Sequence, residues 1–126
     1  MVKLQLIKLV RERNLKQKEK SDPYVLKLLS PVFTGMQGRY TRTKIILALA
    51  EAPLNTLQLS KQLGHDYKTI QRNLKILEEN HLIDRAGKEY GKMFFLSELL
   101  NSNLPTLLKV IEKVDKRLNK KKVYIS

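Results

Sequence analysis

The stretch from Thr56 to Ile83, TLQLSKQLGHDYKTIQRNLKILEENHLI, contains two short amphipathic segments that meet at Gly64. A small residue, Ser60, lies four positions before this glycine. Glycine permits the positive φ of a tight turn, and a small side chain lets two helices approach closely. The stretch therefore predicts a helix-turn-helix.

The two predicted helices have distinct apolar and polar faces. Leu59 and Leu63 form the inner face of the first, and Ile70, Leu74 and Leu77 repeat at steps of four and three along the second. The polar side chains of the second helix are then left to face mostly outward.

This outward face has the chemistry that DNA recognition requires. Arg72 can donate a forked pair of hydrogen bonds to guanine, Gln71 can pair with adenine, and Lys75 suits a phosphate. Thr69 either contacts a thymine methyl group or completes the turn. An ordinary amphipathic helix with a solvated polar side is the alternative. The candidate DNA-binding residues here are Tyr67, Lys68, Thr69, Gln71, Arg72 and Lys75. The acidic pair Glu78 and Glu79 predicts that the far end of the helix points away from phosphate.

The chain is strongly basic, and its charge is uneven. The net charge is +13 over 126 residues, and residues 1–20 and 101–126 each contribute +5 of it. Basic ends suit a polyanionic partner, because neutralised phosphates release counterions. A lysine-rich solvated surface is the alternative.

Several function classes are not expected. The chain has no cysteine and only two histidines, so neither a disulfide, a metal site nor a cofactor is predicted. It lacks a glycine-rich phosphate loop and a nucleophile paired with a base, so it is not expected to be an enzyme. The N-terminal apolar stretch is interrupted by polar residues and is too short to cross a membrane or to act as a signal peptide. A cytoplasmic, nucleoid-associated location is the expectation.

Helices are predicted before the helix-turn-helix. Residues 1–20 favour a helix, although Leu4 and Leu6 would also suit a strand. Asp22-Pro23 begins a helix that should end at Ser30-Pro31, because the residue before proline avoids the helical conformation. Residues 31–38 are predicted as a loop, with Val32, Phe33 and Met36 as its candidates for core packing. An apolar helix should follow over 39–51 and stop at Pro53.

Capping signals and a hairpin complete the central part. Asn55 and Gln58 have capping-box spacing, and Asp66 should cap a helix that runs to about Asn80. Two strand-like runs, 82–86 and 92–97, flank a turn with glycine at both ends and predict a β-hairpin. Its candidate DNA contacts are Arg85, Lys88 and Lys92. A hairpin that merely closes the core is the alternative.

The C-terminal part predicts a helix with an apolar seam. Ser97 or Asn101 should restart a helix, and Asn103 should cap a last one that runs to about Asn119. The seam consists of Leu104, Leu107, Ile111, Val114 and Leu118. It suits a homodimer, which would place two recognition helices about one DNA turn apart on a pseudo-palindromic site. Docking of this helix on its own domain is the alternative.

These elements predict a mainly α fold with a two-stranded β-hairpin wing, a winged helix-turn-helix with helical extensions at both ends. The expected division is a basic N-terminal extension over residues 1–37, a DNA-binding domain over 38–97, and a C-terminal helix with a basic tail over 98–126. The three lysines at 120–122 could contact phosphate, complement the helix dipole or be disordered.

Residues 38–97, GRYTRTKIILALAEAPLNTLQLSKQLGHDYKTIQRNLKILEENHLIDRAGKEYGKMFFLS, resemble the ArsR-like winged-helix regulators, especially their archaeal members. The resemblance rests on the apolar helix near Ile45, the turn at Gly64, the DYKTIQ start of the second helix and the strand that ends in FLS. It implies DNA binding, with Tyr67, Lys68, Thr69, Gln71 and Arg72 at the base-reading positions. Metal-sensing relatives use cysteine-rich sites, so metal sensing is not expected here.

A transcription regulator that binds double-stranded DNA as a homodimer is therefore the leading functional hypothesis. A weakly specific architectural DNA-binding protein and a winged-helix protein-interaction module are the alternatives. Gln71 and Arg72 favour sequence-specific binding over the architectural role, and the basic charge favours DNA over a protein partner.

Overall fold

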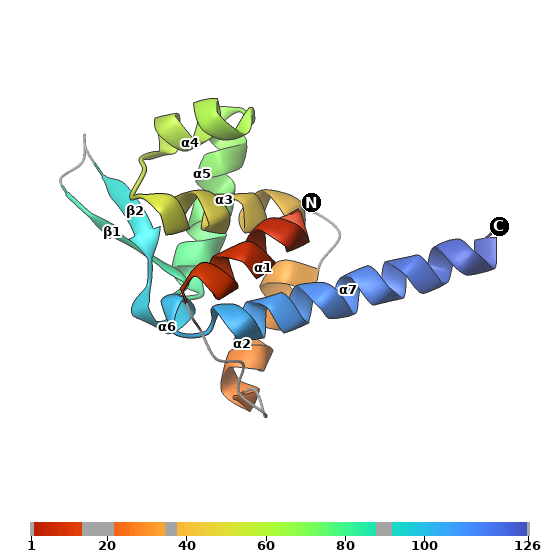
Figure 1. The fold of residues 1–126 in the computed structure, drawn as a ribbon. Helices are drawn as coiled ribbons and strands as arrows, with labels where there is room; N and C mark the ends of the chain where they lie inside the picture. Colours follow the sequence, from red (N-terminus) through yellow and green to blue (C-terminus); the bar gives the residue numbers. More distant parts are fainter. Residues whose placement is uncertain (1, 14–21, 35–37, 88–91, 126) are drawn as a thin grey trace.

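A computed structural model describes residues 2–13, 22–34, 38–87 and 92–125, with side chains described from Lys3 to Val114 inside these ranges. It is mainly helical with a two-stranded antiparallel hairpin, as predicted, and the arrangement is that of a winged helix-turn-helix (Figure 1). The elements are α1 (Val2–Glu12), α2 (Pro23–Thr34), α3 (Arg39–Glu51), α4 (Thr56–Leu63), α5 (Tyr67–Glu79), β1 (Ile83–Ala86), β2 (Met93–Leu96), α6 (Glu98–Asn101) and α7 (Leu104–Ile125).

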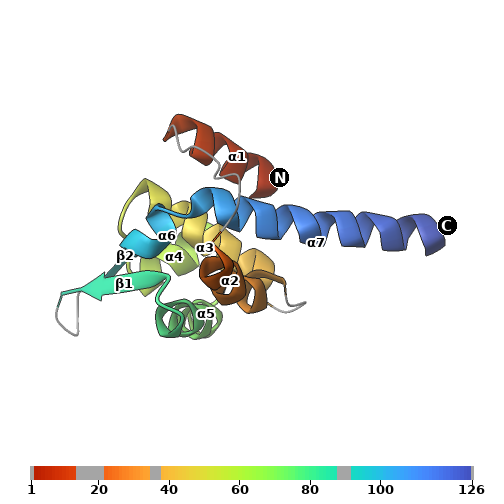
Figure 2. The same cartoon turned by 90° about the horizontal axis from the view of Figure 1, so that it is seen from below.

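One apolar core joins helices from the two ends and the middle of the described chain. It includes Leu6 from α1, Phe33 from α2, Ile46 from α3, Ile70 from α5 and Leu107 from α7. In Figure 2, α1 lies on one side of the molecule and α5 on the opposite side, with α3 and α7 between them. The predicted N-terminal and C-terminal extensions thus share a core with the central helices.

The helix-turn-helix forms as its capping signals predict. Asn55 Oδ1 accepts a hydrogen bond from the Gln58 backbone at 2.8 Å, and Gln58 Oε1 accepts one from the Asn55 backbone at 2.9 Å. Gly64 has a φ of 71° and ends α4 with a hydrogen bond to the Ser60 carbonyl at 3.0 Å. Ser60 also donates its hydroxyl to the His65 carbonyl, so its side chain bonds across the turn as well as being small.

The hairpin is confirmed, and a third segment extends it. Ile83 pairs with Leu96 and Ala86 with Met93. Leu54 forms an isolated antiparallel bridge to Phe94, with N–O distances of 3.1 and 2.8 Å. This bridge anchors the hairpin to the segment between α3 and α4, and a single residue after Pro53 carries no periodicity from which it could be predicted.

The predicted end of α2 at Ser30-Pro31 is wrong, because the helix continues through Pro31 to Thr34. Pro31 is exposed, whereas the following Val32 and Phe33 are 3% and 1% exposed. Ser30 donates its hydroxyl to the Leu26 carbonyl at 2.7 Å, in the turn just before Pro31. Burial of two large apolar side chains outweighs the local preference against proline. Met36, also a predicted packing residue, lies outside the described residues.

The two ends of the chain are also helical. The helix predicted near the N-terminus is confirmed as α1, and Arg13 just after it donates to Asn101 Oδ1 at 2.6 Å and to the Ala50 carbonyl at 2.8 Å. Ser97 caps α6 through the Leu100 backbone N–H. α7 extends beyond the predicted end near Asn119 to Ile125, since no glycine or proline follows Pro105.

A buried polar contact fixes α5 against α3. Arg42 Nη1 donates to Asn73 Oδ1 at 2.9 Å, and Arg42 Nε donates to the Val32 carbonyl at 2.8 Å. Asn73 in turn donates to the Thr69 carbonyl at 2.9 Å. Desolvation by burial lowers the pKa of Arg42, although a guanidinium keeps its charge at any ordinary pH. One arginine therefore links α2, α3 and α5.

The backbone at Gly38 must approach this contact closely. A Cβ atom there would lie 2.5 Å from Arg42 Nη1 and 2.9 Å from Asn73 Oδ1, and the φ of Gly38 is 80°. Both the space and the conformation require glycine.

A second charged group stabilises the start of α5. Asp66 accepts hydrogen bonds from the Thr69 hydroxyl and from the Thr69 backbone N–H. These two bonds, in that order, lower the pKa of Asp66 below its ordinary value, and the positive charge of Arg72 contributes to a smaller extent. The ionised carboxylate thus favours the folded helix.

Asn73→Ala should destabilise the protein by about 1–3 kcal/mol, because it removes an acceptor from a buried guanidinium. Gln71→Ala, two residues earlier on the exposed face of α5, is the matched control and should change stability by no more than about 0.5 kcal/mol. Urea denaturation of both variants measures this. Equal losses would show that the Arg42–Asn73 bond does not stabilise the fold.

Asp66 should make stability depend on pH in the acid range. Because its folded-state pKa lies below the unfolded value of about 3.9, its contribution is fully present above that pH and is lost as pH falls through the folded-state pKa. The free energy of unfolding of Asp66→Asn should therefore fall less steeply with acid than that of the wild type. Denaturant titrations between about pH 5 and pH 2 measure the two curves. Parallel curves would contradict the expectation.

Candidate functional site

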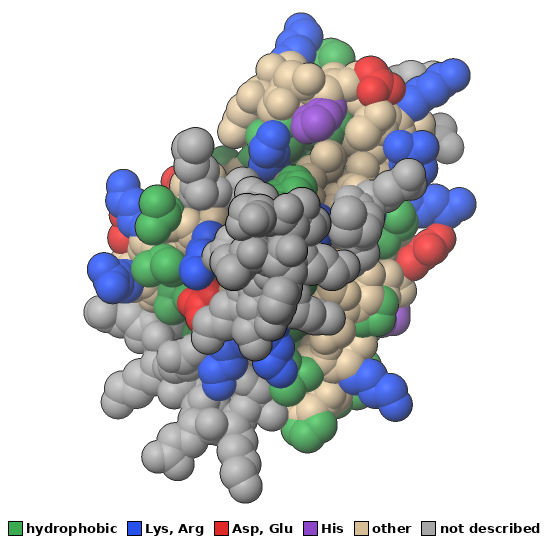
Figure 3. All heavy atoms as spheres, turned by 90° about the vertical axis from the view of Figure 1, so that its right-hand side faces the viewer, with side chains coloured by type: hydrophobic (Ala, Val, Ile, Leu, Met, Phe, Trp, Pro, Cys, Tyr) green, Lys and Arg blue, Asp and Glu red, His purple; other side chains and the backbone are tan. Residues whose placement is uncertain are grey.

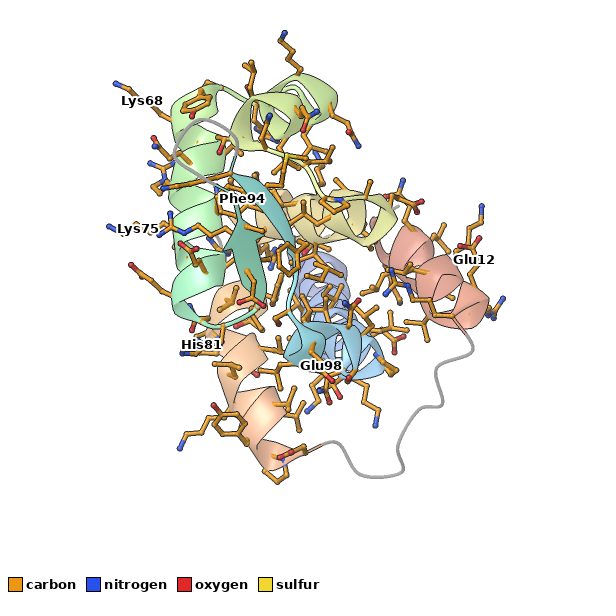
Figure 4. All side chains as sticks on the ribbon, turned by 90° about the vertical axis from the view of Figure 1, so that its left-hand side faces the viewer. Glu12, Lys68, Lys75, His81, Phe94 and Glu98 are labelled. Carbon is orange, nitrogen blue, oxygen red and sulfur yellow. The ribbon has the colours of Figure 1, made fainter. Side chains whose placement is uncertain are left out.

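The polar face of α5 is solvent-exposed over its first two turns. Tyr67 has 48% of its surface exposed, and Lys68, Gln71, Arg72 and Lys75 are also exposed. The opposite face of the helix is buried through Ile70, Asn73, Leu74 and Leu77. In Figure 4, Lys68 and Lys75 project from the same side of α5, away from the body of the molecule. The structure thus brings five of the six predicted α5 residues together on one free surface.

Thr69 lies apart from this set. It is half-buried, and its hydroxyl donates to Asp66 in the N-terminal cap of α5. Of the two roles considered for Thr69, the structure supports completion of the turn. Its side chain positions the start of the helix from which Tyr67 and Lys68 project.

The hairpin adds basic side chains beside α5. A groove of about 710 Å³ lies between the start of α4, the exposed face of α5 and the hairpin, and its walls include Tyr67, Gln71, Lys75, Arg85 and Lys92. Arg85 is exposed and Lys92 is half-buried, so two of the three predicted hairpin contacts line the same groove as the α5 residues. Lys88, the third, lies outside the described residues.

Glu78 changes the electrostatics of this groove. Its Oε2 atom lies 3.0 Å from Arg85 Nε, so the end of α5 and the first hairpin strand are joined by an ion pair. The walls of the groove thus contain three cationic side chains, Lys75, Arg85 and Lys92, and one carboxylate, that of Glu78. Glu79, the next residue, is exposed.

The predicted dimer seam is divided by the fold. Leu104 and Leu107 are completely buried, Val114 is 7% exposed, and Ile111 packs on the edge of the core. These residues lie on a helix that contacts α1 and α2 of the same chain. This part of the seam therefore docks on its own chain, which was the alternative to a dimer contact. The side chain of Leu118 lies outside the described ones, but the C-terminal part of the α7 backbone projects past the other elements (Figure 1).

Positive charge also occurs on a face of the molecule other than that of α5. Figure 3 shows the molecule from the side to which the C-terminal end of α7 points, and Lys and Arg side chains predominate over Asp and Glu side chains around its rim.

Within the described residues, no helix is long and apolar enough to span a membrane. The same part of the chain contains no group of three or more His, Asp or Glu side chains that could bind a metal ion.

The roles of Asn73 and Arg42 and the pairing of Glu78 with Arg85 were not predicted from the sequence. Asn73 interrupts the apolar stripe between Ile70 and Leu77, and a polar residue on an otherwise apolar face signals a buried hydrogen bond. The Glu78–Arg85 pair joins two different elements, so residue spacing gives no signal for it. The acidic pair at the end of α5 predicted that this end points away from phosphate, but Glu78 lines the groove together with the candidate phosphate contacts Lys75, Arg85 and Lys92.

Comparison with known proteins gives a regulatory family. The model of a family described as "Methanogenesis regulatory protein FilR1, N-terminal domain" matches residues 34–112. No curated protein matches the chain. The matched region begins at the end of α2 and continues into α7, so it contains the helix-turn-helix, the hairpin and the groove between them. Because the match covers more than half of the 126 residues, the chain belongs to the family of the FilR1 N-terminal domain, a family of regulatory proteins.

Proposed function

We propose that this chain is a sequence-specific DNA-binding transcription regulator that inserts α5 into the major groove. The main support for this proposal is a row of exposed side chains along the first part of a helix whose opposite face is buried: Tyr67, Lys68, Gln71, Arg72 and Lys75. The first turns of a recognition helix enter the groove most deeply in helix-turn-helix proteins. The regulatory family supports the same function, and its description makes genes of methanogenesis the first candidates for targets.

The position of each side chain suggests its role. Gln71 and Arg72 lie one turn into α5 and suit base edges, because their amide and guanidinium groups can form paired hydrogen bonds with adenine and guanine. Lys75 is one turn further along, and Arg85 and Lys92 extend from the hairpin, so these three suit the phosphate backbone. Specificity then comes from α5 and general affinity from the surrounding cations.

The proposal includes a homodimer that binds a pseudo-palindromic site. The part of α7 that projects beyond the core is available for contact with a second copy, whereas Leu104 and Leu107 are occupied within their own chain. Two copies related by a two-fold axis would present two α5 helices to successive major grooves. We further propose that the protein is an ArsR-like regulator of archaeal type. Its proposed location is the cytoplasm, in association with the nucleoid, and no catalytic activity is proposed for it.

A weakly specific architectural role is the second candidate. It is favoured by the charge of +13, ten units of which come from the two ends of the chain. Such a protein would depend on phosphate contacts and DNA deformability rather than on base contacts. Selection of bound duplexes from a random pool separates the two roles. A recurring motif supports the regulator, and recovery of unrelated sequences supports the architectural protein.

Arg72→Ala should weaken binding to a selected site by roughly 1–3 kcal/mol and relax the preference at one base pair. Lys75→Ala should weaken binding to all duplexes alike and reduce the salt slope by about one. Fluorescence anisotropy on the selected duplex and on random duplexes, at several salt concentrations, distinguishes these effects. If both variants lose the same affinity on every duplex, α5 does not read bases.

Leu118→Lys should shift the protein from dimer to monomer in sedimentation experiments, because it places a charge in the projecting part of the apolar seam. Lys116→Gln, on the same part of the helix but outside the seam, is the control and should remain dimeric. A wild-type protein that is monomeric at micromolar concentration, or a dimeric Leu118→Lys variant, would exclude this interface.

A further inference from the structure

The Glu78–Arg85 ion pair lies where the proposed DNA contacts meet. Glu78 is in the last turn of α5, and Arg85 is the third residue of β1, paired in register with Phe94 on β2. The Arg85 Nε atom lies 3.0 Å from Glu78 Oε2, and the side chains are 49% and 33% exposed. Both residues line the groove that also contains Gln71, Lys75 and Lys92. The pair is therefore accessible from the surface that a duplex would occupy.

A carboxylate at this position opposes binding to a polyanion. Each phosphate contact made by a lysine or arginine releases counterions, and this electrostatic contribution supplies essentially all of the affinity for DNA of arbitrary sequence. A guanidinium that already contacts a carboxylate has its charge balanced, so it attracts a phosphate less strongly. The position of Glu78 thus costs the protein general affinity for DNA.

The neighbouring Glu79 shows that a negative charge on the last turn of α5 is not sufficient for an ion pair with Arg85. Glu79 carries the same charge on the same turn and is exposed, and within the described side chains it makes no ion pair. Glu78 is directed toward the hairpin, and Glu79 is not among the residues that line the groove. The two glutamates therefore differ in their relation to Arg85 and not in their charge.

We propose that Glu78 is an internal competitor of the DNA phosphate for Arg85, and that it lowers the affinity of this protein for DNA of arbitrary sequence. The inference rests on the proposed function, since it requires a duplex in the groove beside α5. In the free protein, Arg85 is balanced by Glu78. A phosphate gains the contact only when the duplex docks closely enough to displace or share the carboxylate. A net charge of +13 attracts polyanions of any sequence, so such competition would favour a selected site over random DNA.

The test compares Glu78→Gln with Glu79→Gln in the full chain. Both substitutions remove one negative charge from the last turn of α5, and glutamine is close in size to glutamate. Fluorescence anisotropy with a random-sequence duplex at several salt concentrations gives the affinity and the salt slope. Glu78→Gln should bind more tightly and steepen the slope by about one, which corresponds to one additional phosphate contact. Glu79→Gln should give a smaller change in both quantities, because its charge acts only at longer range.

Arg85→Gln establishes whether the effect passes through this arginine. In the Arg85→Gln background, Glu78→Gln should no longer exceed Glu79→Gln in its effect on affinity or on the salt slope. Circular dichroism and urea denaturation of each variant show whether the fold is retained.

Three outcomes would overturn the inference. Equal behaviour of Glu78→Gln and Glu79→Gln would mean that only net charge matters, and weaker binding by Glu78→Gln would mean that the carboxylate orients Arg85 for DNA. An undiminished effect of Glu78→Gln without Arg85 would place the competition elsewhere. In each of these cases the wild type still binds DNA and the proposed function stands. A wild type that binds no duplex even at low salt would overturn both.

Discussion

The structure depends on the buried bond between Arg42 and Asn73. A guanidinium that is removed from water must keep its hydrogen bonds, and Arg42 obtains them from the Val32 carbonyl at the end of α2 and from Asn73 on α5. These partners fix the distance and the rotation of α5 relative to α3. Apolar contacts at Ile70 and Leu77 would permit small rotations, but a hydrogen bond of 2.9 Å permits far less. The exposed face of α5 therefore has a defined direction.

That direction concentrates polar chemistry on one surface. Tyr67, Lys68, Gln71, Arg72 and Lys75 are exposed as a set, because the stripe opposite them is anchored in the core. The hairpin, which Leu54 ties to the segment before α4, places Arg85 and Lys92 beside this set. In both ribbon views, the hairpin lies at one end of the molecule and the C-terminal part of α7 projects from the other end. In a single chain, the C-terminal end of α7 is thus distant from the hairpin.

Local signals in the sequence were sufficient for most of the helix boundaries. The Asn55–Gln58 capping box, Gly64 and the Asp66 cap each depend on atoms within a few residues, and all three form as predicted. The ends of α2 and α7 are exceptions. α2 continues past Pro31 because Val32 and Phe33 gain more from burial than the turn at Pro31 loses, and α7 continues past Asn119 to Ile125. The seam of α7 shows a related ambiguity. Steps of three and four residues define an apolar face, but they do not say whether that face meets the same chain or another one.

By itself, the sequence determined the identity and order of the elements, the turn of the helix-turn-helix and the polar side of α5, since spacing and capping are properties of adjacent residues. Only the tertiary structure decided that Asn73 bonds Arg42, that Glu78 pairs with Arg85, that Leu54 bridges to Phe94, and that Leu104 and Leu107 belong to the core. Each of these contacts joins residues on different elements. The relative position of two elements follows from how the whole core packs, and no periodicity within one segment contains that information.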